Sequence, residues 1–154
     1  NEKGIEQAKI MRNNLTSLDI DLIICSPLLR AKETAEIINE ALNVEIIYDE
    51  RIIERDFGEF EGKETKDFDF WDYWDYYKNE HYDKAENIRD FFKRIYDFLD
   101  DICNKYKDKN IMLVTHSGVS IPVACYFNKK IPTGPLVEAG LVLGNCEVKS
   151  YSFY

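Results

Sequence analysis

The chain of 154 residues has only two histidines and four cysteines, and no two cysteines form a Cys-x-x-Cys pair. A structural zinc site needs four clustered cysteine or histidine ligands, so the sequence argues against one. We interpret the cysteines as small thiols buried beside apolar segments. There is also no secretory signal and no apolar run near the roughly 20 residues that cross a bilayer. We therefore expect a cytoplasmic location, reduced thiols and no membrane partner.

Positive charge is scarce as well. Aspartate and glutamate together number 29 against 20 lysines and arginines, which gives a net charge of −9. Such a balance repels phosphate backbones, and no local cluster of basic residues offsets it, so we expect no nucleic-acid partner. A small anionic substrate remains compatible, because a pocket needs only two or three local cations.

The chain begins at Asn1 without a methionine and opens directly in a helical pattern. Ile5, Ala8, Met11 and Leu15 fall at helical spacing after Asn1, which resembles an N-cap. We interpret this opening as a sign that a processed or further N-terminal segment precedes Asn1 in the natural product.

Strand and helix patterns alternate along the rest of the chain. Short apolar runs at 22–25, 44–48 and 111–114 predict strands, and helical periodicity follows at 27–42 and 88–106. This alternation predicts an α/β fold, a three-layer sandwich with a mostly parallel central sheet and helices on both faces. With no repeats and no linker, we treat 1–154 as one domain.

The end of the chain has a different pattern. A further apolar helix is predicted up to about residue 127. Residues 141–153 are expected to be extended, around a turn at Gly144-Asn145.

Ligands of parallel sheets bind beyond the carboxyl ends of the strands. At the first such junction we expect Ser26 to cap a helix with Pro27 at its first position, which places Arg30 one turn into the helix. Its guanidinium would offer a planar charged fork for phosphate or carboxylate. The alternative is a surface arginine, and position alone favours that alternative.

A second junction contains Thr115-His116-Ser117-Gly118, directly after the strand predicted at 111–114. Unpaired backbone N–H groups at the start of the following helix would make a seat for an anion. The alternative is a histidine that only caps or packs. Position favours function modestly, because small residues follow and would let a ligand approach.

Carboxylates crowd the segment between the second predicted strand and residue 62. General acid catalysis needs one carboxyl group with a raised pKa near the leaving oxygen, so most of them must be ordinary solvated charges. Residue chemistry alone does not sort the candidates, which are Glu50, Glu54, Asp56, Glu59 and Glu61.

The segment 63–86 combines aromatic residues with aspartates. Aspartate between the rings argues against base stacking, which favours lysine and arginine there. We expect the segment to be a cap or lid, and His81 within it to be a surface or lid residue. The aromatic residues at helical spacing, expected to pack on the domain or cover a cleft, are Phe70, Trp71, Trp74 and Tyr77.

Three separate segments together resemble a known family. Ser-Pro-Leu-Leu-Arg-Ala begins at Ser26, Glu-Arg-Asp-Phe-Gly begins at Glu54, and Val-Thr-His-Ser-Gly begins at Val114. In this order and spacing they resemble the histidine phosphatase superfamily, the phosphoglycerate mutase-like group that forms a phosphohistidine intermediate. The opening residues and Asn145-Cys-Glu-Val also resemble this family, so the likeness spans the whole chain.

The resemblance implies a role for each matched residue. Arg30 would bind the transferred phosphoryl group, Glu54 would protonate the leaving oxygen, and His116 would hydrogen-bond the phosphoryl oxygens with help from the Ser117 N–H. Arginine and imidazole would then neutralise the developing charge, so neither a metal nor another cofactor is expected.

One family motif is absent. The nucleophilic histidine of the family belongs to an Arg-His-Gly motif at the end of the first strand, and the chain has no such motif. We therefore expect that strand, with the nucleophile, upstream of residue 1; a chain that truly starts at Asn1 should have no turnover.

The leading expectation is a phosphomonoester hydrolase acting on a small phosphorylated substrate. One alternative is a phosphoglycerate mutase, which we expect less because such mutases carry a longer insertion after Glu61-Gly62. The other is a non-catalytic phosphate-binding domain. A homodimer through exposed aromatic residues is possible.

Overall fold

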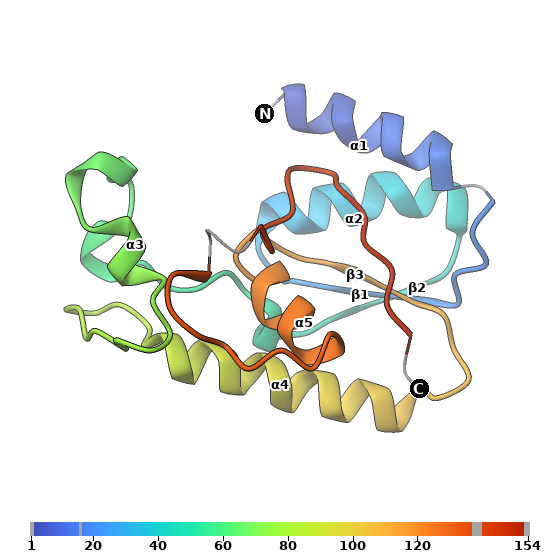
Figure 1. Cartoon of the computed structure of the whole chain (residues 1–154). Helices are drawn as coiled ribbons and strands as arrows, with labels where there is room; N and C mark the ends of the chain where they lie inside the picture. The colour runs from blue at the N-terminus through green and yellow to red at the C-terminus, as the bar shows by residue number, and fades with distance from the viewer. Residues whose placement is uncertain (1, 16, 137–139, 153–154) are drawn as a thin grey trace.

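The computed structural model describes residues 2–15, 17–136 and 140–152. Helices and short strands alternate over most of this length (Figure 1). The helices and strands are α1 (Glu2–Leu15), β1 (Leu22–Cys25), α2 (Leu29–Leu42), β2 (Glu45–Tyr48), the 3-10 turns η1 (Glu50–Ile52), η2 (Gly58–Phe60) and η3 (Thr65–Asp67), then α3 (Phe70–Tyr73), α4 (Ile88–Lys105), β3 (Ile111–Val114) and α5 (Ser120–Phe127).

The three strands form one parallel sheet in the order β2-β1-β3. Leu22 of β1 pairs with Glu45 of β2 on one side and with Ile111 of β3 on the other. All three carboxyl ends therefore meet at the same edge of the sheet. The predicted α/β class is confirmed.

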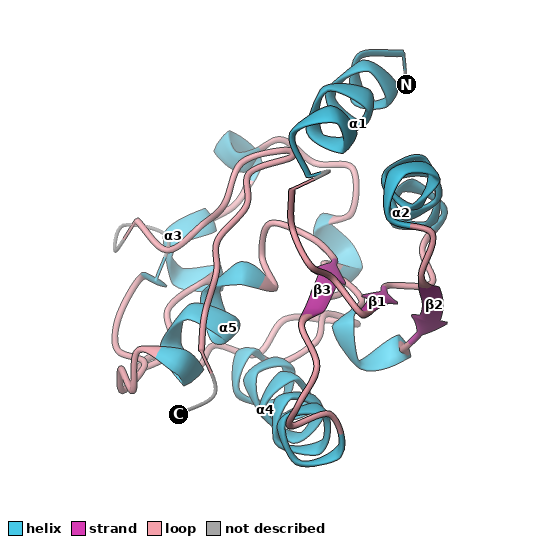
Figure 2. Ribbon diagram, turned by 90° about the vertical axis from the view of Figure 1, so that its right-hand side faces the viewer, coloured by secondary structure: helices cyan, strands magenta, loops and turns pink. Residues whose placement is uncertain are grey.

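Each face of the sheet is covered by helices. Leu22 and Ile24 of β1 pack into a core with α4, whereas Ile23 and Cys25 pack with Ala31 and Ala35 of α2. Successive residues of a strand point to opposite faces, so a continuous apolar run is what a doubly covered strand requires. Figure 2 shows the resulting layers, with α1 and α2 on one side of the strands and α4 on the other.

Helix α4 is the principal element of the larger core. Its first turn is capped by Asn87, whose side chain accepts a hydrogen bond of 2.9 Å from the Arg89 N–H. The helix predicted at 88–106 is confirmed up to Lys105, whereas Tyr106 follows its last residue and is only half-buried. The isoleucine, leucine and phenylalanine residues within the helix are buried. They are Ile88, Phe91, Phe92, Ile95, Phe98, Leu99 and Ile102.

Some local predictions are wrong. Helix α2 starts at Leu29 with an uncapped Leu28 before it, so Ser26 is not the N-cap and Pro27 is not the first helical residue. The strand at 111–114 is only half-buried up to Leu113, because it lies at the edge of the sheet.

The aromatic segment also differs from its periodicity. Helix α3 ends at Tyr73, so the helical spacing of Phe70, Trp71, Trp74 and Tyr77 does not reflect one continuous helix. Trp74 is buried, but Trp71 is 46% and Tyr77 is 77% exposed. His81 is exposed, as expected.

The end of the described chain is extended, with the expected turn. The Glu147 N–H donates to the Gly144 carbonyl at 3.2 Å, which closes that turn. Ser120 in the first turn of α5 anchors the segment, because its hydroxyl oxygen accepts from the Leu143 N–H at 3.0 Å. The predictions of a helix cap at Asn1 and of extended chain at Phe153 concern residues outside the described part of the chain.

Buried thiols are confirmed only in part. Cys25 and Cys125 are buried, whereas Cys103 and Cys146 are half-buried, and all four are free. Burial raises the pKa of the Cys25 thiol to about 11, which leaves it protonated and unreactive near neutrality.

Candidate active site

Two predicted site residues meet at the carboxyl edge of the sheet. Arg30 is the second residue of α2, and His116 is the second residue after β3. The Arg30 Nε–H donates to His116 Nδ1 at 3.2 Å. The sequence separates these groups by 86 positions, and the parallel sheet brings them together.

Ser26 fixes the other nitrogen of the same imidazole. Its hydroxyl oxygen lies 2.7 Å from His116 Nε2, and Ser26 is fully buried. Because a guanidinium can only donate, Nδ1 must accept, and the neutral ring carries its proton on Nε2 and donates it to Ser26. Sequence reasoning took Ser26 for a helix cap and so missed this contact.

The imidazole of His116 is neutral at physiological pH. Burial, together with the positive charges of Arg30 and Arg94, lowers the pKa of His116 from 6.5 to about 4. A negatively charged ligand between these groups would counter that effect.

Among the five candidate carboxylates, Glu54 differs from the others in its burial. It is half-buried between η1 and η2, whereas Glu50, Asp56, Glu59 and Glu61 are exposed. Its Oε2 accepts from the Gly118 N–H at 3.0 Å, and its Oε1 accepts from the Arg55 N–H at 3.0 Å.

Burial raises the pKa of Glu54, although these two N–H groups and the charges of Arg30 and Arg94 oppose the rise. A carboxyl group with a raised pKa can hold a proton closer to neutrality, which suits a general acid.

Gly118 allows this approach of Glu54. A Cβ at this position would lie 2.7 Å from Trp74 Cη2, closer than real Cβ contacts come, and 3.0 Å from Glu54 Cδ, which is tighter than most real contacts. The sequence suggested that small residues here admit a ligand. The structure shows instead that the missing side chain admits the carboxyl group of Glu54.

Ser117 is the exposed residue of the turn into α5. Its carbonyl accepts from the Ser120 N–H at 3.2 Å and from the Ser120 hydroxyl at 2.5 Å. Among residues 2–15, 17–136 and 140–152, no acceptor is found for the Ser117 N–H. This N–H is thus available to an anion at the turn.

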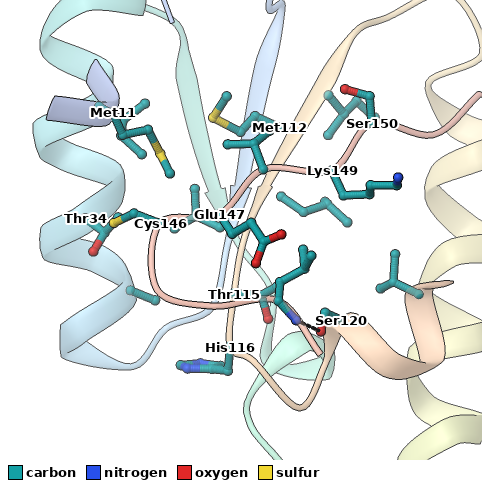
Figure 3. Close-up of a pocket in the computed structure, with 18 of the residues that line it drawn as sticks. Met11, Thr34, Met112, Thr115, His116, Ser120, Cys146, Glu147, Lys149 and Ser150 are labelled. Carbon is teal, nitrogen blue, oxygen red and sulfur yellow. Dashed lines mark hydrogen bonds between the residues drawn. The ribbon is translucent and has the colours of Figure 1, made fainter. Parts of the chain in front are cut away.

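All four predicted site residues line one cavity of about 1210 Å³. Figure 3 shows His116 below the end of its strand, with Cys146, Glu147 and Lys149 of the extended segment across the cavity from the sheet. Within the part of the chain that the structure describes, β3 pairs with β1 alone, and its residues line the cavity. Backbone groups along such an open strand edge can pair with a further strand.

No group of three or more histidine, cysteine, aspartate or glutamate side chains suitable for a metal ion occurs among the described residues. None of the helices described is long and apolar enough to cross a bilayer.

Three residues near Glu54 had no signal in the sequence. Arg55 is 2% exposed and lies with its guanidinium carbon 3.6 Å from the centre of the Tyr73 ring. Arg94 on α4 and Glu86 before it form an ion pair of 2.6 Å. A single arginine beside an apolar stripe is indistinguishable from a surface residue until the packing of α4 is known.

The chain is similar to several curated proteins. It is 31% identical over 122 residues to phosphoserine phosphatase 1 of Hydrogenobacter thermophilus, covering 75% of this chain and 58% of that protein. It is 31% identical over 118 residues to the uncharacterized phosphatase PhoE of Bacillus subtilis, covering 77% of this chain and 58% of that protein. The chain thus spans about three fifths of the length of these curated relatives.

Solved structures give the same result for the fold. YhfR of Bacillus stearothermophilus superposes with a TM-score of 0.76 at 27% identity, covering 88% of this chain and 70% of that one. The family model for the histidine phosphatase superfamily, branch 1, matches residues 1–154. With its parallel α/β sheet and this match over its whole length, the chain belongs to the histidine phosphatase superfamily.

Proposed function

We propose that the complete gene product is a phosphomonoester hydrolase that acts on a small phosphorylated substrate through a phosphohistidine intermediate. The observation that carries the proposal is the convergence of Arg30, Glu54 and His116 on one end of one cavity. A guanidinium, an imidazole and a carboxyl group with a raised pKa are suited to binding and cleaving a phosphate ester.

In this proposal Arg30 and the Ser117 N–H bind the phosphoryl oxygens. The two terminal nitrogens of Arg30 have no acceptor within the described part of the chain, so they are available to an anion. His116 would also contact the phosphoryl group, which requires the Arg30–His116 hydrogen bond to rearrange as the substrate enters.

The nucleophilic histidine would precede Asn1. The chain's own histidines are His81, which is exposed, and His116, which faces Arg30 and Ser26. A strand carrying Arg-His-Gly would fit along the open edge of β3, with its carboxyl end beside His116. The cavity along that edge supports this placement.

The reaction would proceed in two transfers. The imidazole nitrogen attacks phosphorus, the ester P–O bond breaks, and Glu54 gives its proton to the leaving alkoxide oxygen. Water then attacks the phosphohistidine with Glu54 accepting a proton, the P–N bond breaks, and inorganic phosphate leaves.

The segment 63–86 would cover the site and select the leaving group. Buried Trp74 lies close to Gly118, since its Cη2 would be 2.7 Å from a Cβ at that position, and Phe57 stacks on Tyr73 with ring centroids 4.9 Å apart. These aromatic residues would accommodate an apolar or aryl leaving group. Phosphoserine is a reasonable first substrate to test, given the name of the relative described above. The four free thiols support a reducing, cytoplasmic location.

A mutase is the second candidate. A phosphoglycerate mutase of Thermoplasma acidophilum is 36% identical over 67 residues, or 44% of this chain. Release of inorganic phosphate and isomerisation of a phosphoglycerate, measured side by side, separate the two activities. A non-catalytic phosphate-binding domain is the third, and the intact mass of the native protein tests it. A native protein that starts at Asn1 would support the binding domain.

The proposal is tested by comparing substrates whose leaving groups differ in their need for a proton. Glu54→Gln in the complete gene product should lower kcat/KM for an alkyl phosphate by about 10²–10⁴-fold. The loss should be much smaller for 4-nitrophenyl phosphate, whose leaving group needs no proton. Glu61→Gln, which changes an exposed carboxylate of the same segment, is the matched control. Equal losses on both substrates would remove Glu54 from the role of acid.

A further inference from the structure

An ion pair outside the predicted site, between Arg94 and Glu86, binds the backbone of the segment that contains Glu54. Arg94 projects from α4, and Glu86 lies just before that helix begins. The Arg94 Nε–H donates to Glu86 Oε1 at 2.6 Å, and Arg94 Nη2 donates to Glu86 Oε2 at 2.8 Å. This two-point geometry fixes the plane of the guanidinium.

The same guanidinium also holds two backbone carbonyls. Arg94 Nη1 donates to the Arg51 carbonyl at 2.6 Å, and Nη2 donates to the Glu54 carbonyl at 3.3 Å. An arginine can serve a carboxylate and two carbonyls at once because its five N–H donors lie in one plane, whereas a lysine cannot.

The backbone of Glu86 forms two further hydrogen bonds with the same segment. The Glu86 N–H donates to the Asp56 carbonyl at 3.0 Å, and the Glu86 carbonyl accepts from Arg55 Nε at 2.9 Å. Three consecutive residues, 54–56, are thus tied to the pair formed by Glu86 and Arg94.

We propose that Arg94, oriented by Glu86, is a positioning residue that holds the backbone of Glu54 so that its carboxyl group stays at the Gly118 N–H, facing the leaving oxygen. The inference rests on the proposed role of Glu54 as the acid. A helix-to-loop contact that only stabilised the fold would not need to bind the carbonyl of the acid itself.

The test compares Arg94→Met and Arg94→Lys in the complete gene product. If Arg94 positions the acid, Arg94→Met should lower kcat/KM for glycerol phosphate by about 10- to 100-fold, because misplacing a reacting group by about an ångström costs that much. The loss for 4-nitrophenyl phosphate should stay within a few-fold. Arg94→Lys should recover part of the loss, since lysine can reach one carbonyl but not both.

A neighbouring residue supplies the matched control. Lys93 lies beside Arg94 on α4 and pairs with Asp97 at 2.5 Å on the exposed side of the helix. Lys93→Met removes a cation and an ion pair from the same helix, and it should leave both substrates within two-fold.

The double variant with Glu54→Gln separates positioning from stability. Once the acid is absent, Arg94→Met should cause no further loss on glycerol phosphate. Equal losses on the two substrates, or a full additional loss in the Glu54→Gln background, would overturn the inference. If circular dichroism shows that Arg94→Met does not fold, Arg94→Lys and Glu86→Gln replace it. For these variants too, a loss on glycerol phosphate alone supports the inference, and equal losses on both substrates overturn it.

The two proposals can fail separately. If Glu54→Gln itself shows equal losses on both substrates, Glu54 is not the general acid, and the positioning role of Arg94 is then also wrong. If Glu54→Gln shows the selective loss and the variants of Arg94 and Glu86 do not, the positioning role alone is wrong.

Discussion

Arg30 Nε donates to His116 Nδ1 over 3.2 Å, although the two residues are 86 positions apart in the chain. The contact leaves the imidazole a single N–H, which points to Ser26. In the absence of an anion, the site therefore holds a charged guanidinium against a neutral imidazole whose tautomer is fixed.

Removing the guanidinium should weaken the binding of phosphate. Arg30→Ala in the complete gene product is expected to raise the inhibition constant of inorganic phosphate at least about tenfold, because a charge-assisted fork is lost. Arg12→Ala removes an arginine that pairs with Glu40 between α1 and α2 and serves as the control. Unchanged inhibition in Arg30→Ala would exclude Arg30 as the phosphate ligand.

Removing the hydroxyl of Ser26 should allow the imidazole of His116 to adopt both neutral tautomers. In Ser26→Ala the Nε2–H loses its buried acceptor, which should cost about 1–3 kcal/mol of stability. We expect kcat/KM to fall about tenfold, and the ¹⁵N shifts of the ring to show a mixture of tautomers. The exposed Ser17→Ala is the control. A single unchanged tautomer in Ser26→Ala would show that Ser26 does not set it.

A methyl group at position 118 should displace the acid. Gly118→Ala places a Cβ against Trp74 and Glu54, so overpacking should cost about 1–3 kcal/mol and turnover of an alkyl phosphate should fall about 100-fold. Gly144→Ala is the matched control, because a Cβ there comes no closer than 3.5 Å to another atom. Wild-type turnover in Gly118→Ala would mean that the Glu54–Gly118 contact has no part in catalysis.

The titration of His116 should reflect its burial and its cationic neighbours. Its pKa is lowered from 6.5 to about 4, so the unfolded chain binds more protons than the folded one between these values. Its contribution to stability is complete above pH 6.5 and is lost as the pH falls toward 4.

Two measurements check this. An NMR titration should show no protonation of His116 down to about pH 5, with its signals assigned by a His81→Asn variant. In His116→Asn, the free energy of unfolding should depend less steeply on pH between 6.5 and 4. Protonation of His116 near pH 6.5 would contradict the prediction.

The sequence predicted the sheet and its edge well, for a physical reason. Continuous apolar runs such as Leu22–Cys25 suit strands that are covered on both faces, and the residues after parallel strands must gather at one edge. Arg30 and His116 follow β1 and β3 and therefore belong to that edge. Position alone nevertheless favoured a surface role for Arg30, and only the resemblance to the family assigned it to the site.

The sequence could not predict contacts that depend on how separate segments pack. Residue chemistry does not distinguish Glu54 from Glu59, and only the resemblance to the family singled out Glu54. Its contact with the Gly118 N–H depends on a segment that lies after β3. Ser26 has the residue type of a helix cap, and only the position of His116 shows that its hydroxyl is used otherwise. Arg94 on α4 likewise acquires its partners only when the loop at 51–56 packs against that helix.

A crystal structure of the complete gene product with orthovanadate tests the central claim most directly, because vanadate imitates a phosphoryl group in transfer. The account predicts the vanadate at the carboxyl end of β3, bound by the guanidinium of Arg30 and by His116. It also predicts the carboxyl group of Glu54 beside an apical oxygen, with a histidine nitrogen from a segment before Asn1 opposite it. Vanadate bound elsewhere, or bound there without contact to Arg30 and Glu54, would contradict the account.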